Sequence, residues 1–221
     1  MFDVKNVNEV RKDHPDFKSG WNFDPTTGKF ENPKFGYVEH VVLVNETGAP
    51  QYDQYRIGEK PGLVIIPYDI INGETVRVGL IRQERPVPRT NHFEAPRGFG
   101  SNGTALDDIA IQTLLRENNI EIEEARYIGE INANGTFYGD FIPIGIAKVP
   151  HLETVTEGLG NKWENITLSK PFTWSEIAHL DSKGLLDCGI THAALNKFGM
   201  AVPLYLKDAM HYVNGSKKTF T

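Results

Sequence analysis

Three polar residues with helical spacing, Thr113, Arg116 and Glu117, follow a glycine-rich loop at residues 98–103. An α-helix repeats every ~3.6 residues, so side chains three and four positions apart lie on one face. A carboxylate on such a face can bind Mg²⁺, and a guanidinium can bind phosphate through two parallel hydrogen bonds. Metal sites for phosphate chemistry need several carboxylates, whereas this face has one acid and one base. A metal site, a site with other chemistry and an ordinary surface helix are therefore three open interpretations.

Two arginines, Arg82 and Arg85, end a predicted strand shortly before this loop. Arginine suits phosphate recognition because its planar guanidinium donates hydrogen bonds in pairs. The alternative for both residues is surface solvation or structural ion pairing. Glu94, just before the loop, is better suited to holding the loop than to catalysis. His40, His151 and His192 show no spacing typical of zinc ligands, and the single cysteine, Cys188, has no evident base partner.

The elements that must position these residues are strands followed by helices. Valine-rich or alternating runs predict strands at 37–45, 51–57, 62–70, 75–85, 125–132, 141–149 and 166–172. Helices are predicted from Thr104, the expected N-cap, to Asn119, the expected C-cap, and over 173–183 and 191–202. This order favours an α+β fold in which helices cover a β core.

Composition narrows the class of protein. The 221 residues suffice for one large domain with a substantial core, and the net charge of −6 gives no basic signature for nucleic acid. No apolar run approaches the ~20 residues that span a bilayer. The charged N-terminal segment lacks the apolar stretch of a secretory signal, and one cysteine cannot form an internal disulfide. We expect a cytoplasmic protein that binds neither nucleic acid nor a membrane.

The segment EAPRG at residues 94–98, with its loop and helix, resembles the Nudix family, whose box reads G-x5-E-x7-R-E-U-x-E-E-x-G-U with U apolar. Gly98 takes the first glycine position, Leu114 and Ile120 take apolar positions, and Glu117 matches the second of the paired glutamates. The other motif positions are replaced: the box has Glu, Arg, Glu, Glu and Gly at Thr104, Gln112, Thr113, Arg116 and Asn119. The resemblance is therefore to a degenerate Nudix box that lacks most metal-binding glutamates.

The flanking segments extend this resemblance over residues 36–200 and bring it closest to the ADP-ribose pyrophosphatase branch. The segments that carry it are GLVIIPYDI, VRVGLIRQERPV, KWENITL and WSEIAHLDSKGLLDCGITHAALNKF. The resemblance implies a Nudix-type α/β/α sandwich with a mixed β-sheet and an N-terminal strand region. Residues 1–35 would be an extension and 36–221 the Nudix-like domain. The strands at 36–58 would contribute to a homodimer.

The resemblance also implies site residues. Glu117 and Glu164 would be catalytic, with Glu117 as a metal ligand. Ligand binding would involve Arg82, Arg85, Arg97, Gly98 and Arg116, and the Arg97 carbonyl would face a metal. Arg116, however, puts a permanent positive charge where the counter-charge of a metal should lie, a repulsion of ~4 kcal/mol at an effective dielectric near 20. We therefore expect weak Mg²⁺ binding or none.

Three functions are compatible with these residues. The first is binding of a nucleoside-diphosphate-linked ligand such as ADP-ribose, with weak or no hydrolysis. The second is a Mg²⁺-dependent nucleoside-diphosphate-sugar pyrophosphatase whose lost ligands are replaced from elsewhere; the candidates are Asp107, Asp108, Glu153 and Glu157. The third is a non-catalytic scaffold or interaction protein.

Overall fold

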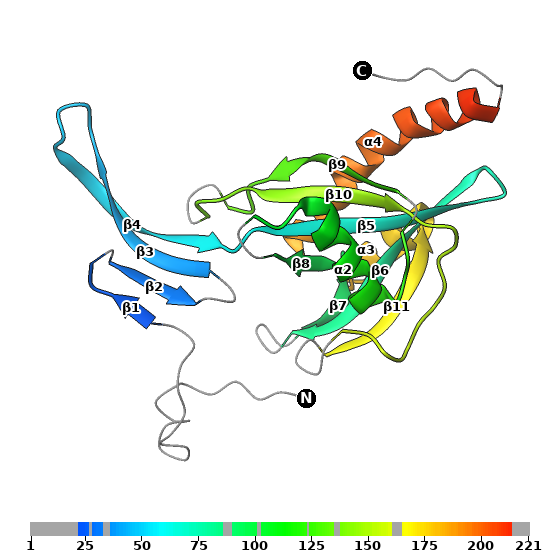
Figure 1. The fold of residues 1–221 in the computed structure, drawn as a ribbon, viewed down its shortest axis with the longest axis horizontal. Coiled ribbons are helices and arrows are strands. Elements are labelled where there is room, and N and C mark those ends of the chain that lie inside the picture. Colours follow the sequence, from blue (N-terminus) through cyan, green and yellow to red (C-terminus); the bar gives the residue numbers. More distant parts are fainter. Residues whose placement is uncertain are drawn as a thin grey trace, which may run out of the picture.

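The structure is a computed structural model that describes residues 22–26, 28–32, 36–85, 90–100, 103–122, 124–134, 138–160 and 165–213. It contains two β-sheets and three helices in these residues (Figure 1). The smaller sheet, which we call the arm, lies beside a larger sheet that carries the helices. Strand β4 of the arm leads into strand β5 of the larger sheet after a two-residue connection.

The arm is antiparallel throughout, in the order β1-β2-β3-β4. Its strands are β1 (Asn22–Asp24), β2 (Lys29–Asn32), β3 (Gly36–Val44) and β4 (Pro50–Glu59). The predicted hairpin around the NETGAP turn is confirmed as β3 and β4. Strands β1 and β2 lie within the segment that the sequence assigns to an extension, and β2 pairs with β3.

The larger sheet has seven strands, with the central order β11-β6-β5-β10-β9; β7 also pairs with β6, and β8 with β5. The strands are β5 (Gly62–Ile71), β6 (Thr75–Arg85), β7 (Thr90–Glu94), β8 (Arg97–Phe99), β9 (Glu124–Ile131), β10 (Ile142–Lys148) and β11 (Ile166–Thr173). The pairing of β10 with β5 is parallel and the other pairings are antiparallel. The sheet is therefore mixed.

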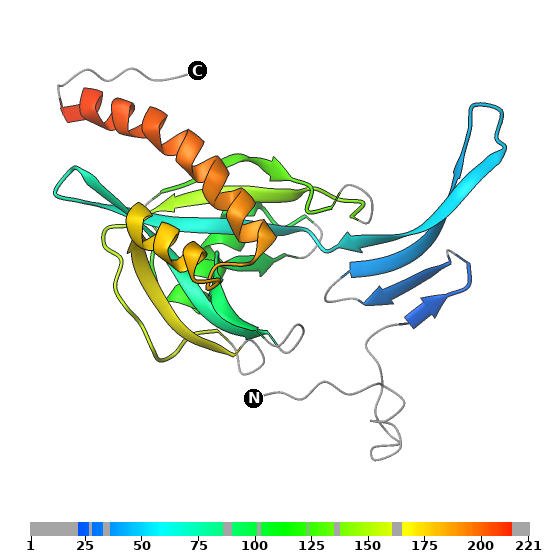
Figure 2. The ribbon, with the colours of Figure 1, turned by 180° about the vertical axis from the view of Figure 1, so that it is seen from behind.

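Helices cover both faces of the larger sheet. They are α2 (Leu106–Asn118), α3 (Trp174–Ser182) and α4 (Gly189–Val213). Figure 1 shows α2 over one face, and Figure 2 shows α3 and α4 over the opposite face. The expected α+β architecture with a mixed sheet is confirmed, and it is consistent with a Nudix-type fold.

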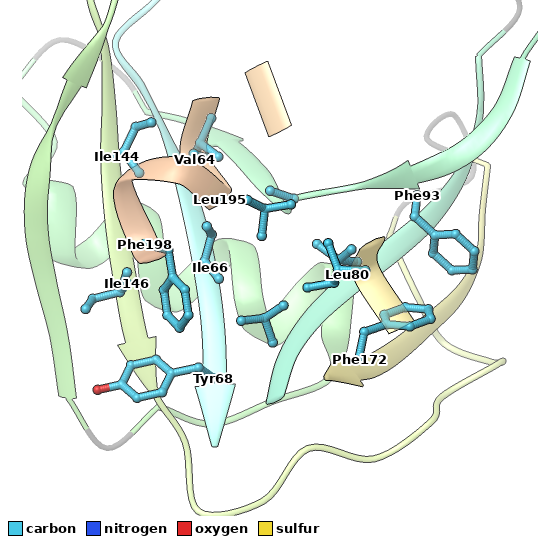
Figure 3. Packing of buried hydrophobic residues seen from close by; sticks show 14 of the residues in the cluster. Val64, Ile66, Tyr68, Leu80, Phe93, Ile144, Ile146, Phe172, Leu195 and Phe198 are labelled. Atoms are coloured by element: carbon cyan, nitrogen blue, oxygen red, sulfur yellow. The ribbon is translucent and has the colours of Figure 1, made fainter. Parts of the chain in front are cut away.

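Strand β5 contributes side chains to two hydrophobic clusters, one on each face of the larger sheet. Successive side chains of a strand point to opposite faces. Val64, Ile66 and Tyr68 accordingly pack with Phe198 of α4 on one side (Figure 3). On the other side, Leu63 and Ile65 belong to a smaller cluster with Ile109, Ala110 and Leu114 of α2. The smaller cluster packs α2 against the sheet, where the helix also contacts β8 and β6.

Helix ends agree with the sequence in part. Asn119 is the C-cap of α2, with φ of 53°, as predicted. Thr104 as N-cap is wrong, because the helix begins at Leu106 and the N-cap position is Ala105, which has no capping side chain. The last helix is longer than predicted, since α4 continues past residue 202 to Val213. Among the described residues, no helix is both long and apolar enough to cross a bilayer.

Candidate functional site

Glu117 is the carboxylate around which the candidate site is built. The last turn of α2 holds it almost fully buried, with its side chain 4% exposed. Its Oε2 accepts a hydrogen bond from the backbone N–H of Arg97 at 3.2 Å, and its Oε1 accepts one from Nη2 of Arg116 at 2.9 Å. Both oxygens of this buried acid therefore have donors from the protein, as buried charges require.

Thr113 lies one turn earlier on the same buried face, but it does not present its hydroxyl to a ligand. The Oγ1 of Thr113 donates to the carbonyl of Ile109 at 2.6 Å. A Cβ placed on Gly98 would lie 1.7 Å from that Oγ1. Glycine at position 98 thus allows β8 to pack directly on α2, and this close approach brings the Arg97 amide to Glu117.

Arg116 forms an ion pair with its neighbour on α2. Its guanidinium contacts Glu117, while its side chain stays 41% exposed. Its carbonyl accepts a hydrogen bond from the N–H of Gly160 at 2.7 Å, so α2 also holds the long loop after β10. Arg116 therefore both pairs with the acid of α2 and remains open to solvent beside it.

Arg85, His92, Glu94 and Asp187 form a second charged cluster, which we call the relay. Arg85 donates to both carboxylate oxygens of Glu94, with Nε at 2.8 Å from Oε1. The Nε2 of His92 lies 2.9 Å from the same Oε1. On the other side of the ring, Nδ1 lies 2.8 Å from Oδ1 of Asp187, without the alignment of a hydrogen bond. The relay joins β6, β7 and the turn between α3 and α4.

The relay borders Glu117. Its hydrogen bonds to Glu94 raise the pKa of Arg85 above the ordinary value, against the opposing effect of burial, and the negative charge of Glu117 adds to the increase. Arg82, in contrast, donates from Nε to the side chain of Asn91 at 3.0 Å. Gly98, Arg116 and Glu117 thus lie where β8 packs on α2, and Arg85 is near enough for the charge of Glu117 to act on it, whereas Arg82 pairs with Asn91 of β7.

Sequence reasoning missed His92 and Asp187. His92 and Glu94 alternate along β7 and so share a face, which was the one local signal available. Asp187 lies more than 90 residues further along the chain, and no motif connects the two positions. Glu164, which the resemblance made catalytic, lies outside the described residues.

Arg97 connects this site to the arm. Its side chain forms an ion pair with Glu59, the last residue of β4. Tyr138 donates to the same carboxylate at 3.3 Å, and burial together with the charge of Glu59 raises the pKa of that phenol. These residues line a cavity of about 360 Å³ between the arm and the larger sheet. The amide of Arg97 therefore faces Glu117 while its guanidinium faces the arm.

The described residues of the α2 face do not match the needs of Mg²⁺, which takes octahedral oxygen ligands. Glu117 has both oxygens engaged by other donors, the Thr113 hydroxyl is turned to the helix backbone, and Arg116 is a cation. Among the described residues, no three His, Cys, Asp or Glu side chains converge to hold a metal ion.

No family model matches the chain, and no curated protein matches it. Among solved structures, the chain is similar to the crystal structure of an ADP compounds hydrolase. The TM-score is 0.60 at 14% identity, over 82% of this chain and 91% of that one. The fold is Nudix-like. At this identity the likeness is one of fold.

Proposed function

We propose that the chain binds a nucleoside-diphosphate-linked ligand, such as ADP-ribose, beside α2, with weak or no hydrolysis. The observation that carries this proposal is the environment of Glu117. This acid is held by Arg116 and by the Arg97 amide, and Arg85 lies within reach of its charge. A half-exposed guanidinium paired with this single buried acid favours a diphosphate over a metal ion, and Arg85, held by Glu94, adds a second positive charge in the same region.

In this proposal, Arg116 supplies part of the positive charge that a metal supplies in hydrolases of the ADP-ribose pyrophosphatase branch, which the sequence resembles. Its half-exposed guanidinium can bond to a phosphate while it keeps its contact with Glu117. A hydrogen bond to a charged group contributes about 1.5–3 kcal/mol. Binding should then proceed without divalent cations.

Titration calorimetry with ADP-ribose, in EDTA and in Mg²⁺, tests this proposal. The wild type should bind equally well under both conditions, and Arg116→Ala should bind roughly ten- to a hundredfold more weakly. Arg126→Ala, an exposed arginine of β9, is the matched control for the loss of one positive charge. The binding proposal fails if no nucleotide-linked ligand binds the wild type under either condition, and the scaffold interpretation then takes its place.

A charge-restoring variant sharpens the same test. Arg116→Glu recreates the paired glutamates of the box with Glu117, and binding should then depend on Mg²⁺. Thr113→Glu is unsuitable as a second step, because Thr113 packs directly against Gly98. Binding that stays metal-independent in Arg116→Glu would mean that Arg116 is not the group that replaces the metal.

The alternative function is a Mg²⁺-dependent pyrophosphatase whose ligands come from other parts of the chain. The description of the similar structure as a hydrolase favours this alternative. Turnover of ADP-ribose in Mg²⁺, lost in Glu117→Gln and retained in the control Arg126→Ala, would establish the enzyme and replace the binding proposal.

We also propose that the chain forms a homodimer through the arm. The strand register places Phe23, Phe30, Val42 and Tyr55 on one face of this sheet. Each of these side chains is at least half exposed, Tyr55 to 61%. A small sheet with an uncovered apolar face needs a packing partner.

Light scattering at micromolar concentration should give twice the chain mass of 24.8 kDa. Tyr55→Lys should shift the mass towards one chain. Gln54→Lys, on the opposite face of the same strand, should leave it unchanged. A wild-type chain that is monomeric at this concentration would refute the dimer.

A further inference from the structure

The relay of Arg85, Glu94, His92 and Asp187 has a geometry that an ordinary salt bridge does not need. Glu94 and His92 are buried, and the two carboxylates contact opposite edges of the imidazole ring. A carboxylate only accepts hydrogen bonds. The Nε2–H of His92 therefore donates to Glu94, and Asp187 places a second carboxylate at the Nδ1 edge of the ring.

We propose that His92 and Asp187 are positioning residues that act on Arg85 through Glu94. In this arrangement Asp187 orients the imidazole, the imidazole fixes the Glu94 carboxylate, and Glu94 holds the Arg85 guanidinium by two bonds. The Arg85 guanidinium is thereby held in one orientation, as a candidate partner of the diphosphate. The identity of the ligand rests on the proposed function. The linkage, by which we mean the coupling of Asp187 and His92 to Arg85 through Glu94, does not.

The backbone around the relay is held independently of its charged groups. The N–H of Phe93 donates to the carbonyl of Leu185 at 2.8 Å, and the N–H of Ala95 donates to Oγ1 of Thr191 at 3.0 Å. Strand β7 therefore stays attached to the turn and to α4 when a side chain of the relay is changed. A substitution at Asp187, whose side chain is half exposed, should leave the fold intact.

A purely structural role explains these residues poorly. Buried charged groups are costly to desolvate, and apolar residues of similar volume often stabilise a protein more. On the opposite face of the same strand, Phe93 packs in an edge-to-face contact with Phe172, so apolar packing is available to β7. The charged groups on the other face of β7 are better explained by the need to orient Arg85.

Asp187→Asn and Asp181→Asn form a matched pair for the test. Both remove one half-exposed carboxylate beside a histidine of the closing helices, but Asp181 contacts His192 at 3.3 Å, outside the relay. Asp187→Asn should weaken ADP-ribose binding roughly three- to tenfold, and Asp181→Asn should not. In an Arg85→Ala background, Asp187→Asn should have no further effect, which a general structural defect would not produce.

A second readout requires no ligand. The Nε–H of Arg85 should give a protected signal in nitrogen-15 NMR spectra, identified by its loss in Arg85→Lys. Asp187→Asn and His92→Leu should accelerate its hydrogen exchange, whereas His92→Gln, which retains an N–H donor for Glu94, should restore protection. Asp181→Asn should leave it unchanged.

The two readouts separate the two proposals. If the wild type binds no nucleotide but shows these exchange effects, the proposed ligand is wrong and the proposed coupling of Asp187 and His92 to Arg85 stands. Arg85 exchange that is insensitive to Asp187→Asn and His92→Leu overturns the linkage, whether or not a nucleotide binds.

Discussion

Strands β4 and β5 follow each other in the chain and have ten residues each, yet they belong to very different environments. The first eight residues of β5 are all buried, because α2 covers one face of its sheet and α4 the other. Strand β4 has no such cover, and its Tyr55 is among the most exposed large side chains of the described residues. Both strands contain aromatic and β-branched residues. What differs is the covering helix, so burial here follows from packing partners and not from strand propensity.

The arm is joined to the larger sheet near one of its ends. Besides the ion pair of Arg97 with Glu59, the N–H of Gly139 donates to the carbonyl of Ile57 at 2.9 Å, and Tyr138 pairs with Ile57 as an isolated bridge. These contacts attach the end of β4 to the loop before β10. The far end of the arm gains none of this support in the described residues, and Val44 there is 57% exposed.

The largest expected difference is between a core truncation and the same truncation in the arm. Leu80→Ala removes a fully buried side chain from the larger sheet and should cost about 2–5 kcal/mol of unfolding free energy. Val42→Ala removes an exposed side chain and should cost less than ~0.5 kcal/mol at dilutions where the chain is monomeric. Urea unfolding of both variants checks this. A loss of several kcal/mol in dilute Val42→Ala would mean that the arm is packed within one chain.

A smaller effect is expected where β8 meets α2. Gly98→Ala introduces a Cβ that clashes with Oγ1 of Thr113, and overpacking of this kind costs about 1–3 kcal/mol. Thr113→Ala removes that oxygen, so the double variant should be less destabilised than the sum of the two single variants. Thermal unfolding of the four proteins measures this coupling. Additive losses would show that the two residues do not touch.

The smallest effect concerns the start of α3, where Thr173 and Glu176 form a capping box. Hydrogen bonds from the backbone and hydroxyl of Thr173 lower the pKa of Glu176 below its ordinary value. A lowered pKa gives stability that is present above the unfolded pKa, near ~4.3, and is lost as pH falls through the folded pKa. Because Glu176 is exposed, Glu176→Gln should cost only a few tenths of a kcal/mol at pH 7 and almost nothing at pH 3. Equal losses at both pH values would contradict this assignment.

The sequence predicted the elements whose signals are local. The apolar run of β5, the NETGAP hairpin and the C-cap at Asn119 each depend on residues that lie next to one another in the chain. The prediction failed at Thr104, where a residue suited to capping stands one position before the true N-cap. The ion pair of Arg116 with Glu117 joins neighbouring helix positions, which do not normally face each other, so helical spacing alone does not predict it. The contact of His92 with Asp187 depends on tertiary structure alone, and no spacing in the sequence encodes it.

The hydrogen bond between Ala95 and Thr191 joins residues 96 positions apart, and it has a consequence for how the chain acquires its structure. Contacts of such long sequence separation form late, because a large loop must close before they add stability. During synthesis, β5, β6 and α2 emerge well before α4 can reach β7. Strand β7, which carries His92 and Glu94, can therefore form its contacts with α4 only after the segment around residue 191 has been synthesised. The orientation of Arg85 is among the last features that a nascent chain completes.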